Sequence, residues 1–312
     1  MSTSRTGRVL VATSGSASSQ SAITFAARTA ESRGLDLELI HVVNPTVSVG
    51  PYGVAPDALV RQAGRELLAR GEQLAKRVAP HVDVVSTLAI GARPDAIVEK
   101  AHDAELVVVG APPHDLVGRL WTGSTVTGVA ARSTCPVAII PARDDEPLHH
   151  RVLVGLKTTK HAEDLLAAAF AVANQTGSEL RIMHTWQLLS PYDNAVAERL
   201  PVPEWELEEK HDIEAMLINL EMAYPNVAAH VDVVHGQAAH ELVEASEHAD
   251  VLVISRPLHG GYLHHLGATA RAVIREARCP ILVVPPGDAL VRGDLARAGA
   301  LSHTRAHPGV EP

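Results

Sequence analysis

The sequence predicts two tandem α/β domains, each a doubly wound, five-stranded parallel sheet with helices on both faces. Length is the first reason: the chain has 312 residues, and two domains of about 140 to 150 residues are expected for that size. Composition is the second. Hydrophobic residues make up 46% and aromatic residues 3%, and a core of Val, Leu, Ala and Ile suits helices packed on a parallel sheet. An internal duplication is the third.

Four segments of the first half recur in the same order in the second half. The matched pairs are residues 8–11 and 151–154, 39–41 and 181–184, 81–85 and 230–234, and 135–141 and 279–285. The offset between the halves drifts only from 143 to 149 residues. One domain has therefore been duplicated with small changes in its loops.

Within each half, short apolar runs alternate with helical stretches. The first half predicts strands near residues 8–12, 37–43, 82–90, 106–110 and 137–140, and helices near 19–33, 57–79, 94–103 and 124–132. The last helix places Val126, Val129 and Ala130 on one face, which is the spacing of a core-facing helix. The second half predicts strands near 151–155, 179–185, 230–235, 251–255 and 281–284. Apolar strands separated by helices indicate a parallel sheet covered on both faces.

Short polar segments mark the expected domain boundaries. The first domain spans residues 8–142 and the second 151–286, joined by a short polar linker at 143–150. Residues 1–7 and 287–312 lack a sustained apolar stripe, so we expect both ends to be disordered.

Charge and cysteine content exclude several classes of protein. A formal net charge of -9 argues against a nucleic-acid binder, which needs clustered Lys and Arg. No apolar stretch approaches the ~20 residues of a membrane span, and the polar start does not resemble a signal peptide. Cys135 and Cys279 both precede proline at matching places, so we expect two equivalent structural positions rather than a disulfide. A cytoplasmic location is expected.

A glycine-containing loop after the fourth strand is the candidate binding feature. In the first half, Gly110-Ala-Pro-Pro113 is followed after nine residues by Gly123-Ser124-Thr125. Such a loop, leading into the start of a helix, is how many α/β domains hold a nucleotide phosphate. The second half has Ser255-Arg-Pro-Leu258 and then Gly267-Ala268-Thr269, one residue sooner.

Together, these motifs resemble those of the universal stress protein family in its tandem form. The resemblance rests on Val-Leu-Val in the first strand, His-Val in the second, the loop after the fourth and the final Cys-Pro strand. It covers residues 8–141 and 151–285. It implies an adenine nucleotide alpha hydrolase-like fold with sheet order 3-2-1-4-5, whose order reverses between strands one and four, where α/β sheets bind ligands.

ATP-binding members of that family carry an Asp after strand one and the pattern G-x2-G-x9-G-[ST]. Transferred to the first repeat, the resemblance implies a nucleotide site at Ser14, Val42, Gly110, Gly123, Ser124 and Thr125. Two departures from the family pattern weaken the expected nucleotide site. Pro113 replaces the second glycine and has no amide N–H, and Ser14 replaces the Asp and accepts hydrogen bonds less strongly. The alternative is that Gly123-Ser124 is only a turn followed by a helix N-cap.

The second repeat departs much further from the family pattern. Lys157 replaces the Asp, Ser255 and Leu258 replace both glycines, and Ala268 replaces the hydroxyl, so we expect no nucleotide there. Lys157, Arg256, His259 and His264 could instead form a different anion site; a solvated histidine-rich loop at 259–265 is the favoured alternative. The 18 histidines have no metal-ligand spacing, so no metal is expected.

The predicted function is a stress-response protein that acts by binding and association, with ATP or a related adenine nucleotide held weakly in the first repeat. Strands 137–140 and 281–284 would be edge strands, and we expect the repeats to pack together by pairing them. A homo-oligomer and an unidentified protein partner stay open. The alternative is a nucleotide-free interaction scaffold. Catalysis is not expected, although a weak ATPase stays open, with Asp115 the only acid inside the loop of the first repeat.

Overall fold

A computed structural model describes residues 7–44, 57–111, 124–142, 148–158, 162–188, 190–197, 199, 203–256 and 266–286. The expected disordered ends lie outside these residues, apart from Gly7.

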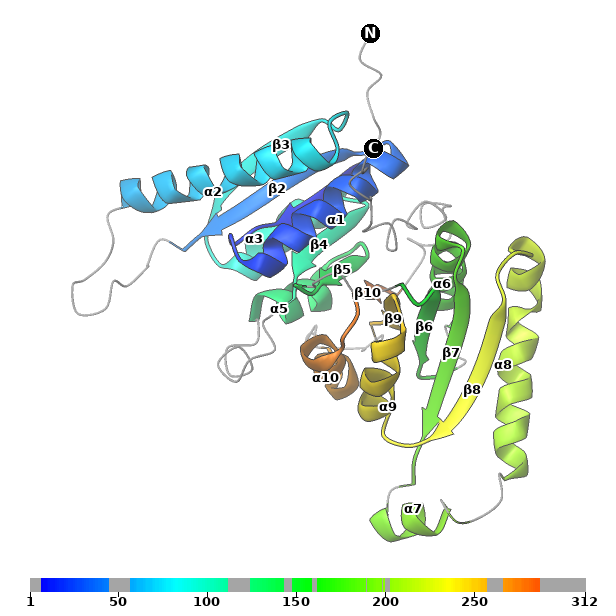
Figure 1. Cartoon of the computed structure of the whole chain (residues 1–312). Helices are drawn as coiled ribbons and strands as arrows, with labels where there is room; N and C mark the ends of the chain where they lie inside the picture. The colour runs from blue at the N-terminus through cyan, green and yellow to red at the C-terminus, as the bar shows by residue number, and fades with distance from the viewer. Residues whose placement is uncertain are drawn as a thin grey trace, which may run out of the picture.

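The strands form one continuous ten-stranded sheet in the order β3-β2-β1-β4-β5-β10-β9-β6-β7-β8 (Figure 1). Repeat one, the N-terminal half, contributes β1 (Arg8–Ala12), β2 (Asp36–Val43), β3 (Val84–Ile90), β4 (Leu106–Gly110) and β5 (Val137–Ile140). Repeat two contributes β6 (Arg151–Leu156), β7 (Glu179–Trp186), β8 (Ala229–His235), β9 (Val251–Ser255) and β10 (Ile281–Val284). Within each repeat all pairings are parallel, and the order 3-2-1-4-5 occurs twice, which confirms the predicted fold class.

Helices cover both faces of this sheet, and each face has its own hydrophobic core that runs through both repeats. One core includes residues of α1 (Ala17–Arg33), α2 (Asp57–Val78), α6 (Glu163–Thr176) and α8 (Glu204–Ala223). The other includes residues of α3 (Arg93–Lys100), α5 (Ser124–Arg132), α9 (Ala238–Ala245) and α10 (Ala268–Glu276). A short helix, α7 (Pro191–Ala197), was not expected from the sequence.

The two repeats join where β5 and β10 pair antiparallel. Ile281 lies opposite Ile139 and Val283 opposite Val137, and every residue of both strands is buried. An exposed row of unpaired N–H and C=O groups on an apolar edge strand favours aggregation. By pairing, β5 and β10 each cover the edge of the other strand, as expected for these two segments.

Local sequence explains why α1 begins and ends where it does. The hydroxyl of Ser16 caps the helix by accepting a hydrogen bond from the Ser19 N–H at 3.2 Å. The helix ends at Gly34, whose φ of 65° is the left-handed conformation that glycine adopts without strain. Ala22, Ala26 and Ala30 recur every four residues and are fully buried, so the helix lies close against the sheet. Its first turn is thereby placed beside the carboxyl ends of β1 and β4.

Candidate functional site

The candidate site of repeat one is the crevice at the carboxyl ends of β1 and β4, where the strand order reverses. Ser14 follows β1, and Gly110 ends β4. The structure therefore brings together these two predicted residues, which are 96 positions apart in the sequence. Gly123 and Pro113 lie outside the described residues, so the middle of the predicted loop is not part of this description.

Gly110 has a structural reason to be glycine. A Cβ atom at this position would lie 2.7 Å from the Ser18 carbonyl carbon and 2.8 Å from both the Ser18 oxygen and the Ser19 nitrogen. These are backbone atoms of the first turn of α1, and a real Cβ atom does not approach so closely. Gly110 is therefore needed for the helix to reach the sheet, whether or not a ligand binds. Ser255 stands at the equivalent end of β9.

A run of serine hydroxyls occupies the position where the family has a carboxylate. Ser14 Oγ donates to Ser16 Oγ at 3.0 Å, and Ser16 Oγ lies 3.2 Å from Ser18 Oγ. All three side chains are at least partly exposed. Ser16 and Ser18 were not predicted as site residues, although their alternation with Ser14 in the sequence is a visible signal. These hydroxyls can both donate and accept hydrogen bonds at the helix start.

Val42 and Thr125 are placed differently from each other. The Val42 side chain is buried in the second core, where it packs in β2, so only its backbone is available to a ligand. Thr125 is the second residue of α5 and is half-buried. Ser124 begins that helix, as the sequence predicts for the residue after the loop. A helix start is a favourable place for an anion because its N–H groups are unpaired.

A histidine ties the ends of the first two strands together in both repeats. His41 Nδ1 donates to the Thr13 carbonyl at 2.8 Å, and His184 Nδ1 donates to the Leu156 carbonyl at 3.1 Å. This link between the first two strands is thus the same in both repeats.

Arg256 corrects the interpretation of the second crevice. Its guanidinium Nη1 donates to the carbonyls of Ala131 and Ser133, both at 2.8 Å. These carbonyls end α5 of repeat one, so the side chain reaches across to the other repeat. Burial lowers the pKa of Arg256. An anion site that used Arg256 with Lys157 would have to compete with these bonds.

Other positions at the same place in repeat two also differ from those of repeat one. Lys157 is exposed directly after β6. Among the described residues, the N-cap position of α6 is Ala162, which has no side-chain oxygen to cap the helix as Ser16 does in α1. Leu258, His259 and His264 lie outside the described residues.

Both cysteines are buried and neither forms a disulfide. Burial raises the pKa of the Cys135 thiol, so this group stays protonated and is a poor nucleophile.

Two histidines that lie close together in the sequence, His235 and His240, contact other side chains. His235 Nε2 lies 2.8 Å from Asn194 Oδ1, and its ring centroid is 4.2 Å from that of Trp186. His240 Nε2 lies 3.7 Å from a carboxylate oxygen of Glu244. Among the described residues, no group of three His, Cys, Asp or Glu side chains could hold a metal ion. Within the same part of the chain, no helix has the length and apolar character needed to cross a membrane.

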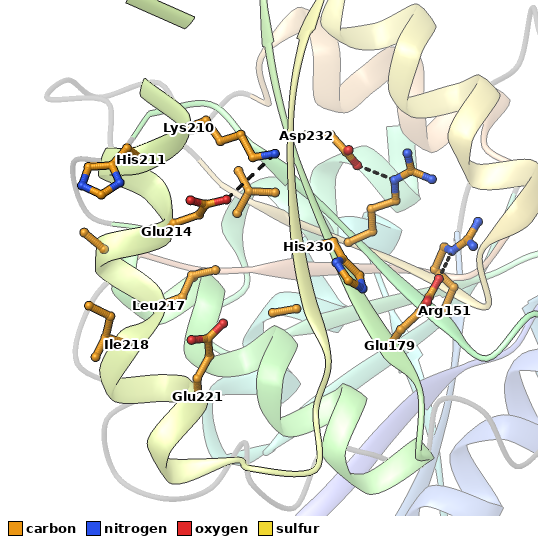
Figure 2. A pocket seen from close by; sticks show the side chains of 14 residues that line it. Arg151, Glu179, Lys210, His211, Glu214, Leu217, Ile218, Glu221, His230 and Asp232 are labelled. Atoms are coloured by element: carbon orange, nitrogen blue, oxygen red, sulfur yellow. Dashed lines mark hydrogen bonds and ion pairs between the residues drawn. The ribbon is translucent and has the colours of Figure 1, made fainter. Parts of the chain in front are cut away.

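A second concave region lies at the far end of the sheet, between α8 and β8 (Figure 2). This groove has a volume of about 870 Å³ and was not predicted from the sequence. Arg181 pairs with Asp232, Arg151 pairs with Glu179, and Lys210 lies 3.9 Å from Glu214. Because its basic groups already have acidic partners, the groove does not present the concentrated positive charge that a nucleotide phosphate needs.

Comparison with known proteins agrees with this architecture. The sequence pattern described as the universal stress protein family matches residues 6–141 and again 149–285. Universal stress protein Rv2005c of Mycobacterium tuberculosis is 30% identical over 285 residues, a match that covers 88% of this chain and 96% of that one. The crystal structure of a universal stress protein from Archaeoglobus fulgidus DSM 4304 has the same fold, with a TM-score of 0.66 at 20% identity over 91% of this chain and 98% of its own. A universal stress protein solved in complex with cAMP is 28% identical, with a TM-score of 0.36, over 45% of this chain and 100% of its own.

Proposed function

Because this chain belongs to the universal stress protein family, we propose that it acts by binding and association and not by catalysis. Repeat one holds a weakened adenine-nucleotide site, and repeat two holds none. The difference between the two crevices is the observation that carries this proposal.

Repeat one keeps the features that a nucleotide needs. The first turn of α1 lies against Gly110, and the exposed hydroxyls of Ser14, Ser16 and Ser18 lie at the same end of β1. Hydroxyls can bond the ribose, and the start of α5 at Ser124 can accept phosphate. A hydroxyl accepts a hydrogen bond less strongly than the family's carboxylate, so the site is weakened.

In repeat two, the residues at the same end of the sheet differ in chemistry from those of repeat one. Arg256 bonds the carbonyls that end α5, and Lys157 stands where an acceptor for the ribose is needed. A lysine ammonium has only donors, so it cannot accept from a ribose hydroxyl.

The residues around the first crevice support binding without catalysis. Of the described positions 12–19 and 109–111, none is Asp, Glu or His, and the neighbouring His41 has its Nδ1 bonded to the Thr13 carbonyl. General acid–base catalysis needs such a group within hydrogen-bond reach of the proton that moves. The alternative function, a nucleotide-free scaffold, is favoured by the structural role of Gly110, which needs no ligand to explain it.

Calorimetric titration with ATP tests the proposal. We expect one site per chain with a Kd tighter than about 1 mM, equivalent to about −4 kcal/mol. Ser14→Asp should tighten binding about tenfold, because a hydrogen bond to a charged acceptor is stronger by about 1 to 1.5 kcal/mol. The matched control is Lys157→Asp in repeat two, which should not change the affinity.

Two results would count against the proposal. If neither the natural chain nor Ser14→Asp binds ATP, the scaffold function replaces it. If the chain releases phosphate from ATP and Gly123→Val abolishes the release, the protein is an enzyme.

A further inference from the structure

Strand β8 lies at one end of the sheet, and β7 is its single neighbour among the described strands. Two hydrogen bonds show which of its peptide groups face β7. The Leu180 N–H donates to the Ala228 carbonyl, and the Gly236 N–H donates to the Trp186 carbonyl. Because every second residue of a parallel strand bonds the same neighbour, the even-numbered residues from 228 to 236 bond β7. The residues whose N–H and C=O groups point outward are Ala229, Val231, Val233 and His235.

β8 lacks the features that usually protect an edge strand from pairing. Proline, lysine and β-bulges are the common ones. The seven residues of β8 include no proline and no lysine, and they pair with β7 in continuous register. Its one acidic residue, Asp232, is paired with Arg181. A strand from another chain can therefore add to this edge.

The groove of about 870 Å³ lies along the same free edge (Figure 2). Residues 229–232 of β8 line it, and successive side chains of a strand point to opposite faces. The groove therefore extends over both faces of β8. Helix α8 forms one wall, and His230 and Asp232 lie on the other side of the strand (Figure 2). An added strand fits such a hollow, because its own side chains also alternate between two faces.

The side chains beneath α8 explain why there is room beside this edge. The buried residues of α2, the equivalent helix of repeat one, include Gly64 and Gly71. A Cβ atom at Gly64 would lie 2.7 Å from Leu88 Cδ1 of β3, so glycine lets α2 approach its strands closely. α8 contains no glycine, and its buried residues are Ile213 and Leu217. Larger side chains at a close-packed interface keep a helix farther from its sheet.

One carboxylate of the groove has no basic partner. Each Lys and Arg side chain in the lining is paired with one acidic side chain. Glu221 is the remaining acid of the lining, and no basic group among the described residues lies within ion-pair distance of it. Ile218, which is 55% exposed, lies one helical turn away and also lines the groove. A basic side chain next to an apolar one complements this wall.

We propose that β8 binds an extended segment of a partner protein, which adds to the sheet as an eleventh strand. Hydrogen bonds to the outward peptide groups supply affinity, and the two walls select alternate side chains. The segment places a Lys or Arg beside Glu221 and an apolar residue against Ile218. This proposal rests on the role in association proposed above. Its test needs no nucleotide, so failure to bind a peptide and failure to bind ATP are distinguishable.

A synthetic peptide tests the binding. The sequence Lys-Thr-Val-Thr-Lys-Thr-Val, with blocked ends, places Lys and Val on one face of an extended strand and Thr on the other. Calorimetric titration of the full chain should give a Kd tighter than about 1 mM. The same peptide with Glu in place of Lys should bind at least about tenfold more weakly. No binding of the lysine peptide at about 1 mM overturns the proposal.

Amide hydrogen exchange shows whether the peptide adds as a strand. With peptide bound, the outward amides of Ala229 and Val231 should exchange at least about tenfold more slowly. The amides of His230 and Asp232 are the internal control, because they already bond β7 and should change much less. Binding without this difference overturns strand addition. If the outward amides become protected when the chain alone is concentrated, a second copy occupies the edge and the proposed partner is wrong.

Two substitutions test the edge and the wall separately. Ala229→Pro removes an outward N–H at the first residue of β8, where proline is tolerated, and should weaken peptide binding about tenfold. Glu221→Lys should weaken it at least about fivefold. Glu99→Lys is the control, because it makes the same change of net charge at an exposed position of α3. Melting temperature shows that each variant is folded. If Glu221→Lys binds the lysine peptide as tightly as Glu99→Lys does, the peptide does not lie in this groove.

Discussion

Replacement of Arg256 by alanine removes the side chain that joins the loop of repeat two to helix α5 of repeat one. Two hydrogen bonds of 2.8 Å are lost, and their acceptors belong to Ala131 and Ser133, which are 5% and 1% exposed. A hydrogen bond to a charged group contributes about 1.5 to 3 kcal/mol, and a buried acceptor left unpaired has its own cost. Since Arg256 is only half-buried, hydrogen bonds to water compensate for part of this loss of free energy. We expect Arg256→Ala to lower the free energy of unfolding by about 2 to 3 kcal/mol.

Urea unfolding measures this loss as a lower midpoint with an unchanged slope. Arg278→Ala is the matched control, because that side chain is 63% exposed and lies 3.7 Å from Glu247. Exposed ion pairs contribute about 0 to 1 kcal/mol. Arg256→Lys, which keeps the charge but not the planar fork, should fall between the two. If Arg256→Ala is no less stable than Arg278→Ala, the contact between the repeats does not hold α5.

Two further predictions concern the crevice frame and the core. Gly110→Ala should lower the free energy of unfolding by about 1 to 3 kcal/mol, because the new Cβ forces the backbone of Ser18 to move. Gly267→Ala is the control, because its Cβ would have nothing within 4 Å, and it should change the free energy of unfolding by about 0.5 kcal/mol or less in thermal melts. Equal effects of the two substitutions would contradict the close approach of α1 to Gly110. Burial raises the pKa of Cys135 above its usual 9.0, so the folded chain keeps a proton that the unfolded chain releases as pH rises past that value. The stabilising contribution of this thiol is complete below pH 9.0 and is lost as the pH rises above that value. The difference in free energy of unfolding between the natural chain and Cys135→Ala, measured in urea, should therefore shrink between about pH 8 and pH 10. A difference that does not change with pH would contradict burial of the thiol.

Most of the fold could be predicted because it rests on short-range patterns. The central strands β1, β4, β5, β6, β9 and β10 are nearly continuous apolar runs, and the duplication repeats each of these signals. Helix α7 was missed because its seven residues show no apolar stripe. Contacts outside the helix help to hold it: Asn194 Nδ2 donates to the carbonyls of Leu188 and Ser190, and Asn194 Oδ1 bonds His235. Bonds to backbone carbonyls and to a residue 41 positions away leave no periodic signal.

The candidate site could be predicted only where a residue type itself indicates its role. Gly110 ends one strand and Ser14 follows another, and the structure places them at the carboxyl ends of the neighbouring strands β4 and β1. The bonds from Arg256 to repeat one were not predicted, because their acceptors are backbone carbonyls 123 and 125 positions away, and every residue has such a carbonyl.

The junction between β5 and β10 also frees the two halves to change independently. In a dimer of identical chains, every substitution appears on both sides of the shared strands and in both crevices. Here the equivalent strands belong to one polypeptide, and a linker keeps their effective concentration high without any requirement for identity. A substitution such as the arginine at position 256 is then introduced once. One half can lose its binding residues and support the other, which a symmetric pair of chains cannot do.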